Sequence, residues 1–147
     1  KATSSKVENL IVPDSYISFM AGDNKVITPN LKELKIIHRL LKNSEETVEI
    51  MSENISKELG CCVVTTFEAG ESFIFVTGRG VTTKIPIELF EPQRNIHGTG
   101  CTFSSSLAVN LAKGIPLNES VGLSAQYTLE KVKKSVRYNK SGQYFLQ

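Results

Sequence analysis

The sequence lacks the long apolar runs and the charge imbalance that mark two common classes of protein. Its longest apolar runs, such as residues 73–76, are far shorter than the roughly 18 residues that a membrane-spanning helix needs. Lysine and arginine number 17 against 15 aspartates and glutamates, so the formal charge is only +2. Because binding to nucleic acid or to an anionic membrane depends on a basic surface, we expect no nucleic-acid partner and no membrane partner.

Cysteine and histidine are scarce and are not spaced as metal ligands. Three cysteines cannot all pair within one chain, and His38 and His97 lie far from each other and from any CxxC string. Cys61 and Cys62 are adjacent in a β-branched run, and we interpret them as small strand residues in a reducing compartment. Residues 1–6 have neither an initiator Met nor the apolar core of a signal peptide. We therefore expect a soluble, cytoplasmic protein from which an upstream segment is missing.

The chain is too short for two ordinary domains. With 147 residues, 40% of them hydrophobic and 22% charged, it has the composition of a globular domain rather than of a disordered or fibrous chain. A chain of about 150 residues buries roughly 68–70% of its unfolded surface, which allows a sizeable core. No repeat, low-complexity tract or linker interrupts the sequence, so we treat residues 1–147 as a single domain.

The spacing of apolar residues predicts an alternation of strands and helices. Leu31, Leu34, Ile37 and Leu41 follow the 3.6-residue period of a helix, and β-branched runs bounded by turn residues predict strands. The expected strands are residues 25–28, 61–67, 72–77 and 82–87, and the expected helices are residues 9–21, 31–41, 44–59, 100–113 and 118–136. This order favours an α/β layered sheet that is not purely parallel. Because the strands are few for two covering layers of helices, we expect an incomplete sheet.

The expected helix ends rest on residues that are common at caps. Gly60 and Gly114 follow two apolar-periodic segments and should end those helices. Asn118 should cap the last helix, whose apolar stripe is expected to continue as far as Val136.

One segment has the composition of a phosphate-binding loop. Gly98 and Gly100 flank Thr99 directly before a predicted helix. Glycines let the backbone approach a ligand closely, and the first N–H groups of a helix form an anion site at the positive end of its dipole. The same field favours the thiolate form of Cys101, which would place a base beside the donors, as phosphoryl transfer requires. The alternative is an ordinary loop at the start of a helix, in which Cys101 fills the core.

A second candidate segment lies where a strand meets the helix at Leu31. Asn30 and Glu33 stand three residues apart in the first helical turn, at the strand end where α/β sheets usually bind substrates. A glutamate there could order Mg²⁺ through water, because this ion dehydrates reluctantly. Asparagine at the N-cap with glutamate three residues later also forms a capping box, which needs no function. The residues alone leave both interpretations open and favour the cap.

Two further segments have weaker signals. Residues 65–71 combine a polar strand end with a tight turn, which could contact a nucleotide but more often forms a simple hairpin. Lysines and an arginine gather near the C-terminus, and the absence of interleaved aromatic residues favours a solvated helix face. These basic residues are Lys131, Lys133, Lys134, Arg137 and Lys140.

The order and spacing of these segments resemble a known family more closely than any one of them does alone. The matching strings are Val26-Ile27-Thr28-Pro29-Asn30-Leu31-Lys32-Glu33, His97-Gly98-Thr99-Gly100-Cys101-Thr102-Phe103-Ser104 and Asn110-Leu111-Ala112-Lys113-Gly114. Together they resemble the hydroxymethylpyrimidine/phosphomethylpyrimidine kinases of thiamine biosynthesis, in the ribokinase-like superfamily. The resemblance covers nearly the whole chain as the C-terminal half of that family. It implies the C-terminal part of a three-layer α/β/α sandwich, with the pyrimidine-binding N-terminal half absent.

The resemblance also implies a role for each matching residue. Gly98, Thr99 and Gly100 would supply the backbone anion hole for the phosphoryl group, and Cys101 would take or position the proton of the substrate hydroxyl. Asn30 and Glu33 match a superfamily Asn-x-x-Glu motif that organises Mg²⁺ and the phosphates of ATP. Thr66 would lie near the nucleotide. The resemblance thus implies Gly98, Thr99, Gly100 and Cys101 as catalytic residues. It implies Asn30, Glu33 and Thr66 as ATP-binding residues, and Glu33 as the metal ligand.

Two departures from the family pattern bear on the substrate. The string after Thr65-Thr66 resembles the Thr-x-Gly loops of other ribokinase relatives, and Ile96 stands where a threonine is common. The expected function is ATP-dependent phosphorylation of 4-amino-5-hydroxymethyl-2-methylpyrimidine or its monophosphate. The alternatives are a pyridoxine/pyridoxal kinase of the same superfamily and a non-catalytic nucleotide-binding fragment. A homodimer or a complementing N-terminal half are the expected protein partners.

Overall fold

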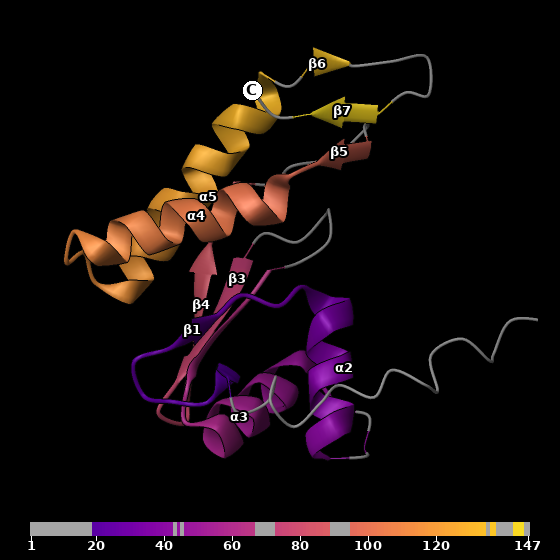
Figure 1. The fold of residues 1–147 in the computed structure, drawn as a ribbon, viewed down its shortest axis with the longest axis vertical. Coiled ribbons are helices and arrows are strands. Elements are labelled where there is room, and N and C mark those ends of the chain that lie inside the picture. The colour runs from indigo at the N-terminus through magenta and orange to yellow at the C-terminus, as the bar shows by residue number, and fades with distance from the viewer. Residues whose placement is uncertain are drawn as a thin grey trace, which may run out of the picture.

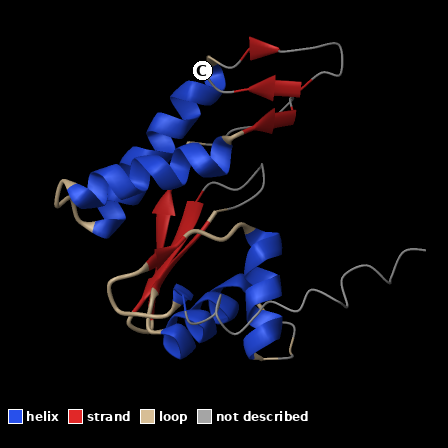
Figure 2. Ribbon diagram, viewed as in Figure 1, coloured by secondary structure: helices blue, strands red, loops and turns tan. Residues whose placement is uncertain are grey.

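The computed structural model describes residues 19–42, 44, 46–66, 73–88, 95–134, 136–137 and 143–145 (Figures 1 and 2). In chain order its elements are β1 (Val26–Ile27), α2 (Leu31–Leu41), α3 (Val48–Leu59), β2 (Cys62–Thr65), β3 (Phe73–Gly78), β4 (Val81–Pro86), β5 (Asn95–His97), α4 (Thr99–Ala112), α5 (Leu117–Lys133), β6 (Val136–Arg137) and β7 (Gln143–Phe145). Residues 19 and 20 are helical, and most of the helix expected over 9–21 lies outside the described residues. The expected turn at 68–71 lies outside them as well.

The main sheet has four strands in the order β1-β2-β3-β4. Strand β1 pairs with β2 in parallel, with Val26 opposite Cys62, whereas β2–β3 and β3–β4 are antiparallel. All four expected strands are present, and the prediction of a sheet that is not purely parallel is confirmed. The β3–β4 hairpin turns at Arg79 and Gly80, both of which have positive φ angles, 52° and 77°. Among the described residues, Arg79 is the only non-glycine residue with a positive φ angle.

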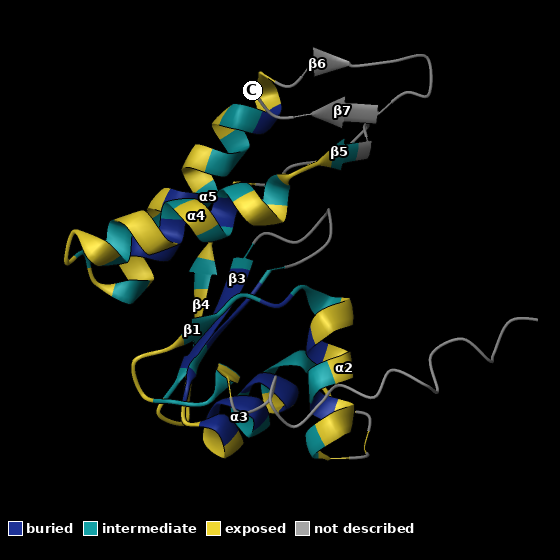
Figure 3. Ribbon diagram, in the orientation of Figure 1, coloured by how far each residue is buried: buried dark blue, intermediate teal, exposed yellow. Residues whose placement is uncertain are grey.

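Helices cover both faces of this sheet and create two separate cores (Figures 1 and 3). Val63 and Val64 are consecutive in β2 and fully buried, and alternation along the strand directs them to opposite faces. One core lies against α2 and α3 and consists of Leu34, Met51, Ile55, Leu59, Cys61 and Val63. The other lies against α4 and α5 and consists of Val64, Ile74, Val76, Phe103, Leu107 and Val121. The expected three-layer α/β/α arrangement is confirmed.

A second, small sheet was not predicted from the sequence. Strands β5, β7 and β6 pair in that order, β5–β7 in parallel and β6–β7 antiparallel. The expected continuation of the last helix to Val136 is wrong, because α5 ends at Lys133 and Val136 pairs with Phe145 in the strand ladder. The small sheet brings the segment before α4 next to residues close to the C-terminus.

Two helix starts also differ from the expected ones. The last helix begins at Leu117, with Pro116 as its N-cap, so the prediction of Asn118 as N-cap is wrong. Pro116 has a φ of −55°, close to the angle that its ring imposes, and its carbonyl accepts the first helical hydrogen bond from the Ser120 N–H. Helix α3 begins at Val48, because the Thr47 hydroxyl caps the N–H of Ile50. The predicted ends at Gly60 and Gly114 are confirmed, both with positive φ.

Candidate phosphate-binding site

The junction between β1 and α2 has a complete capping box. The Asn30 Oδ1 accepts a hydrogen bond from the Glu33 N–H at 3.0 Å, and the Glu33 Oε2 accepts one from the Asn30 N–H at 2.9 Å. Asn30 is half-buried and Glu33 is exposed. The structural interpretation of this motif is therefore confirmed. It leaves the other carboxylate oxygen of Glu33 outside the cap, at the strand end where α/β sheets bind ligands.

Thr66 lies beside this junction. It forms an isolated parallel bridge with Asn30, and its N–H donates to the Pro29 carbonyl at 3.1 Å. The preceding residue, Thr65, is fully buried, and its hydroxyl lies 3.0 Å from the Ser52 hydroxyl of α3. The ends of β1 and β2 are thus fixed relative to each other and to α3, and Thr66 and Asn30 share one edge of the sheet.

The glycine-flanked segment forms the start of α4, and this start has no side-chain cap. Gly98 is the N-cap residue with a φ of 96°, a conformation that favours glycine, and among the described residues no side chain caps this helix start. A Cβ placed on Gly100 would meet nothing within 4 Å. Thr99, Gly100 and Cys101 form the first turn, whose N–H groups have no partner within the helix. The segment therefore has open donors, open space and the positive end of a 14-residue helix.

Cys101 is exposed at this helix start. The alternative in which it fills the core is therefore wrong. The other two cysteines differ, since Cys61 is buried and Cys62 is half-buried. Burial, and to a smaller extent the neighbouring Cys62, raises the pKa of the Cys61 thiol. Cys62 lies in β2 as expected, whereas the interpretation of Cys61 as a strand residue is wrong, because it directly precedes the strand.

One hydrogen bond joins the two parts of the site. The Thr28 hydroxyl, directly after β1, lies 2.8 Å from the Ser104 hydroxyl in the second turn of α4. The start of α4 is therefore held against the sheet edge that carries Asn30 and Thr66. The structure thus gathers the expected site residues in one region: Asn30, Glu33, Thr66, Gly98, Thr99, Gly100 and Cys101.

The described residues of the site provide few side-chain ligands for a metal ion that is bound without a nucleotide. In the part of the chain that the structure describes, no three His, Cys, Asp or Glu residues lie together as a metal site. A single carboxylate, that of Glu33, is nevertheless enough for Mg²⁺, which keeps several waters and takes its remaining ligands from substrate phosphates. The donor set therefore fits a magnesium ion that arrives with a nucleotide.

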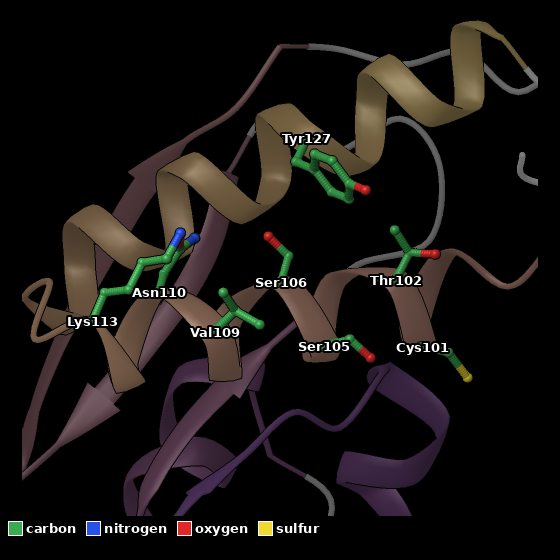
Figure 4. A pocket seen from close by; sticks show the side chains of 8 residues that line it. All are labelled: Cys101, Thr102, Ser105, Ser106, Val109, Asn110, Lys113 and Tyr127. Atoms are coloured by element: carbon green, nitrogen blue, oxygen red, sulfur yellow. The ribbon is translucent and has the colours of Figure 1, made fainter.

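A groove between α4 and α5 begins beside Cys101, and sequence reasoning did not predict it (Figure 4). Its volume is about 570 Å³, and Tyr127 of α5 points toward α4 across it. The lining residues are Cys101, Thr102, Ser105, Ser106, Val109, Asn110, Lys113 and Tyr127. Cys101, Ser105 and Val109 follow one another at intervals of four residues, so they lie on one face of α4. This spacing is the feature of the sequence that could have indicated the groove.

Three of the C-terminal basic residues lie at the end of α5. Lys133 and Lys134 are exposed, and Lys133 pairs with Glu88 at 3.1 Å. The Lys131 ammonium lies 5.6 Å from the centre of the Tyr127 ring. The interpretation as a solvated helix face fits the exposed Lys133 and Lys134 at the end of α5. It is wrong for Arg137, which lies in β6, and Lys140 lies outside the described residues. No helix among the described residues is long and apolar enough to cross a membrane.

The sequence matches the family model described as phosphomethylpyrimidine kinase over residues 6–145. The chain belongs to this family. A hydroxymethylpyrimidine/phosphomethylpyrimidine kinase from Staphylococcus aureus (strain MRSA252) is 34% identical over 116 residues, which is 71% of this chain and 42% of that relative. The chain therefore spans less than half of the length of the curated relative it matches.

Solved structures show that this member of the phosphomethylpyrimidine kinase family has a ribokinase-like fold. The pyridoxal kinase from Staphylococcus aureus in complex with AMP-PCP and pyridoxal has a TM-score of 0.75 at 21% identity, covering 90% of this chain and 51% of that one. Ribokinase from Thermotoga maritima has a TM-score of 0.61 at 22% identity, covering 70% of this chain and 34% of that one. At these identities the likeness concerns the fold.

Proposed function

We propose that the chain is the C-terminal, phosphate-binding half of a kinase that transfers phosphate from Mg·ATP to 4-amino-5-hydroxymethyl-2-methylpyrimidine or its monophosphate. The observation that carries this proposal is the uncapped, glycine-flanked start of α4, held next to the Asn30–Glu33 cap by the Thr28–Ser104 hydrogen bond. The family membership and the relative's name support a substrate of the hydroxymethylpyrimidine class.

In this proposal the start of α4 binds the phosphoryl group in flight. The N–H groups of Thr99, Gly100 and Cys101 face the place where negative charge spreads over the transferred oxygens, which lowers the energy of the transition state. Gly98 allows the turn that exposes these donors, and Gly100 leaves room above them. The exposed Cys101 thiol positions the substrate hydroxyl or accepts its proton.

Asn30, Glu33 and Thr66 hold the nucleotide side of the site. Glu33 would hold Mg²⁺, and the ion would neutralise charge on the ATP phosphates. Asn30 keeps the Glu33 side chain in place, because each of the two caps the backbone of the other. Thr66 borders the nucleotide from the end of β2. Most of the rate then comes from positioning and charge stabilisation, as is typical of phosphoryl transfer.

We propose that the missing pyrimidine half is supplied by a segment that precedes these residues or by a separate chain. The chain spans 42% of the curated relative. In the described structure β1 pairs with β2 and leaves its other edge open to a further strand. The groove on α4 and α5 carries exposed Val109 and Tyr127, with 52% and 46% of their surface accessible. A homodimer is the other arrangement that would cover the groove on α4 and α5.

The three free cysteines support a reducing compartment such as the cytoplasm.

The test is release of ADP from Mg·ATP by the purified chain, with and without the hydroxymethylpyrimidine. The assay is repeated after adding the N-terminal half of the Staphylococcus aureus relative as a separate polypeptide. Pyrimidine-dependent ADP release in either sample would support the proposal. ATP binding with no turnover in both samples would leave a nucleotide-binding fragment and overturn it.

A second candidate, phosphorylation of pyridoxal or pyridoxine, is favoured by one observation. The pyridoxal kinase from Bacillus subtilis, solved as an ADP complex, is 25% identical to this chain with a TM-score of 0.67. Pyridoxal offered side by side with the pyrimidine separates the two candidates, because the ratio of kcat/KM values identifies the substrate.

A further inference from the structure

We propose that Thr28 and Ser104 are positioning residues that couple the metal-binding side of the site to its phosphate-binding side. Their hydroxyls lie 2.8 Å apart and are half-buried. Thr28 precedes the Asn30–Glu33 cap on one side, and Ser104 follows the Gly98–Cys101 segment on the other. This inference rests on the proposed function, because it assigns the pair a role in binding Mg·ATP.

The Thr28 hydroxyl is presented from a rigid position. Its backbone precedes Pro29, and a residue before proline is confined to extended conformations. The Pro29 carbonyl is itself bonded to the Thr66 N–H at 3.1 Å, and the next residue, Asn30, pairs with Thr66. Because its backbone is held in this way, the Thr28 side chain fixes Ser104 relative to this edge of the sheet.

Ser104 uses its hydroxyl differently from similar residues in the neighbouring helix. In α5 the hydroxyls of Ser124 and Thr128 donate to carbonyls one turn earlier in their own helix, at 2.7 and 2.8 Å. That is the common arrangement for such residues within a helix. Ser104 instead reaches out of its helix to another element. The contact therefore fixes α4 relative to β1 and does not merely satisfy the hydroxyl.

The start of α4 has a particular need for such a contact. Gly98 makes no side-chain cap, and Gly100 adds the most flexible residue type to the first turn. Leaving these N–H groups uncapped keeps them available to a ligand, but it removes the usual restraint on a helix end. The Thr28–Ser104 bond supplies a restraint one turn later without occupying the donors.

The consequence concerns the distance between Glu33 and the α4 donors. Glu33 and the α4 N–H groups would act together on Mg·ATP only when the distance between them is fixed. Small misplacements of binding groups cause large losses in such arrangements. Mg²⁺ should therefore tighten ATP binding strongly in the native chain and weakly when the pair is broken.

The experiment measures the dissociation constant of ATP by calorimetry with Mg²⁺ and with EDTA. The ratio of the two constants is the coupling factor. Thr28→Val keeps the side-chain shape and removes the hydroxyl, and we expect it to lower this factor about five- to tenfold, the effect of about one lost hydrogen bond. Ser104→Ala should do the same, the double variant should be no worse than either single one, and Thr28→Ser should retain the factor.

The matched control is Ser56→Ala, which removes a buried hydroxyl that donates to the Cys61 carbonyl at 2.7 Å, at the opposite end of β2. This variant should lower the melting temperature and leave the coupling factor unchanged. A native coupling factor in both Thr28→Val and Ser104→Ala would overturn the positioning role while leaving ATP binding intact. Absence of ATP binding by the native chain would overturn the proposed function, and this inference with it.

Discussion

Asn30 and Thr66 pair in parallel at the point where β1 has ended and α2 begins. Asn30 therefore has two tasks, since its backbone joins the end of β2 and its side chain caps the N–H of Glu33. The carboxyl ends of parallel strands form the edge at which α/β sheets bind ligands. The pairing thus places Thr66 next to the cap that holds Glu33, the carboxylate proposed to orient a metal ion. A test of this proposal must distinguish the capping role of Glu33 from its metal-binding role.

Glu33→Gln should distinguish the capping role of Glu33 from its proposed role in binding the metal ion. The glutamine Oε1 can still accept the Asn30 N–H, so α2 stays capped, but the negative charge that orients Mg²⁺ is lost. We expect the melting temperature to change by less than about 2–3 °C. The coupling of Mg²⁺ to ATP binding should fall at least about tenfold. Thermal denaturation and calorimetry on the same sample check the two effects.

Glu33→Ala is the matched comparison, because it removes both the charge and half of the capping box. It should lose the same metal coupling and additionally cost about 0.5–1 kcal/mol of unfolding free energy. If the glutamine variant kept full metal coupling, Glu33 would be only a cap.

Gly98→Ala and Gly100→Ala should have opposite effects on stability. Gly98 has a φ of 96°, which a side chain tolerates poorly, so alanine should destabilise the fold by about 1–2 kcal/mol. Gly100 lies inside α4, where an added methyl group would meet nothing within 4 Å, so alanine should be neutral or stabilising by up to about 1 kcal/mol. Both variants should nevertheless weaken ATP binding. In Gly100→Ala the added methyl group would occupy the space of the ligand. Urea denaturation with ATP titration tests this, and an unaltered ATP affinity in Gly100→Ala would place the phosphate elsewhere.

Cys101→Ala should lower turnover far more than it lowers ATP affinity. In the preparation that shows pyrimidine-dependent ADP release, we expect a loss in kcat of at least about 10²-fold, as is typical for a group that handles the reacting proton. Cys62→Ala, which alters the half-buried thiol of β2, should leave kcat unchanged. If Cys101 had only a structural role, Cys101→Ala would instead reduce stability and leave the rate per folded molecule unchanged.

Features that depend on a few neighbouring residues were predictable from the sequence. The Asn30–Glu33 cap needs only residues three apart, and the end of α3 at Gly60 needs only one glycine in a left-handed conformation. The position of Cys101 at a helix start followed from the glycines before it, and its exposure excluded the core alternative. Local rules therefore located the candidate site, while the roles of its residues remain predictions.

Features that depend on distant pairing were not predictable in this way. Val136 continues the apolar stripe of α5, but a strand ladder with Phe145 offers its backbone other partners. The contact between Thr28 and Ser104 joins residues that no sequence period relates. In each case tertiary contacts decide among alternatives that are locally equivalent.

Cys61 should make stability depend on pH in the alkaline range. Burial raises its pKa in the folded chain, so the unfolded chain loses this proton at a lower pH than the folded chain does. The resulting contribution to stability is fully present below the ordinary thiol pKa and is lost as pH rises through the raised value. Urea denaturation at pH 7 and above pH 9 should show a smaller decline for Cys61→Ala than for the native chain. Equal declines would contradict the pKa shift.

Alkylation by iodoacetamide should distinguish the three thiols and report the ligand. The thiolate is the reactive form, so Cys61, which is 2% exposed and has a raised pKa, should react only after unfolding. Cys101 is exposed at the start of α4 and should be labelled first. Mg·ATP should slow the labelling of Cys101, since its phosphates are proposed to occupy the neighbouring N–H groups, and should not affect Cys62. Mass spectrometry of labelled peptides over time gives each rate separately. Protection of Cys62 together with Cys101 would indicate a general tightening of the fold, and protection of neither would place the nucleotide away from this helix.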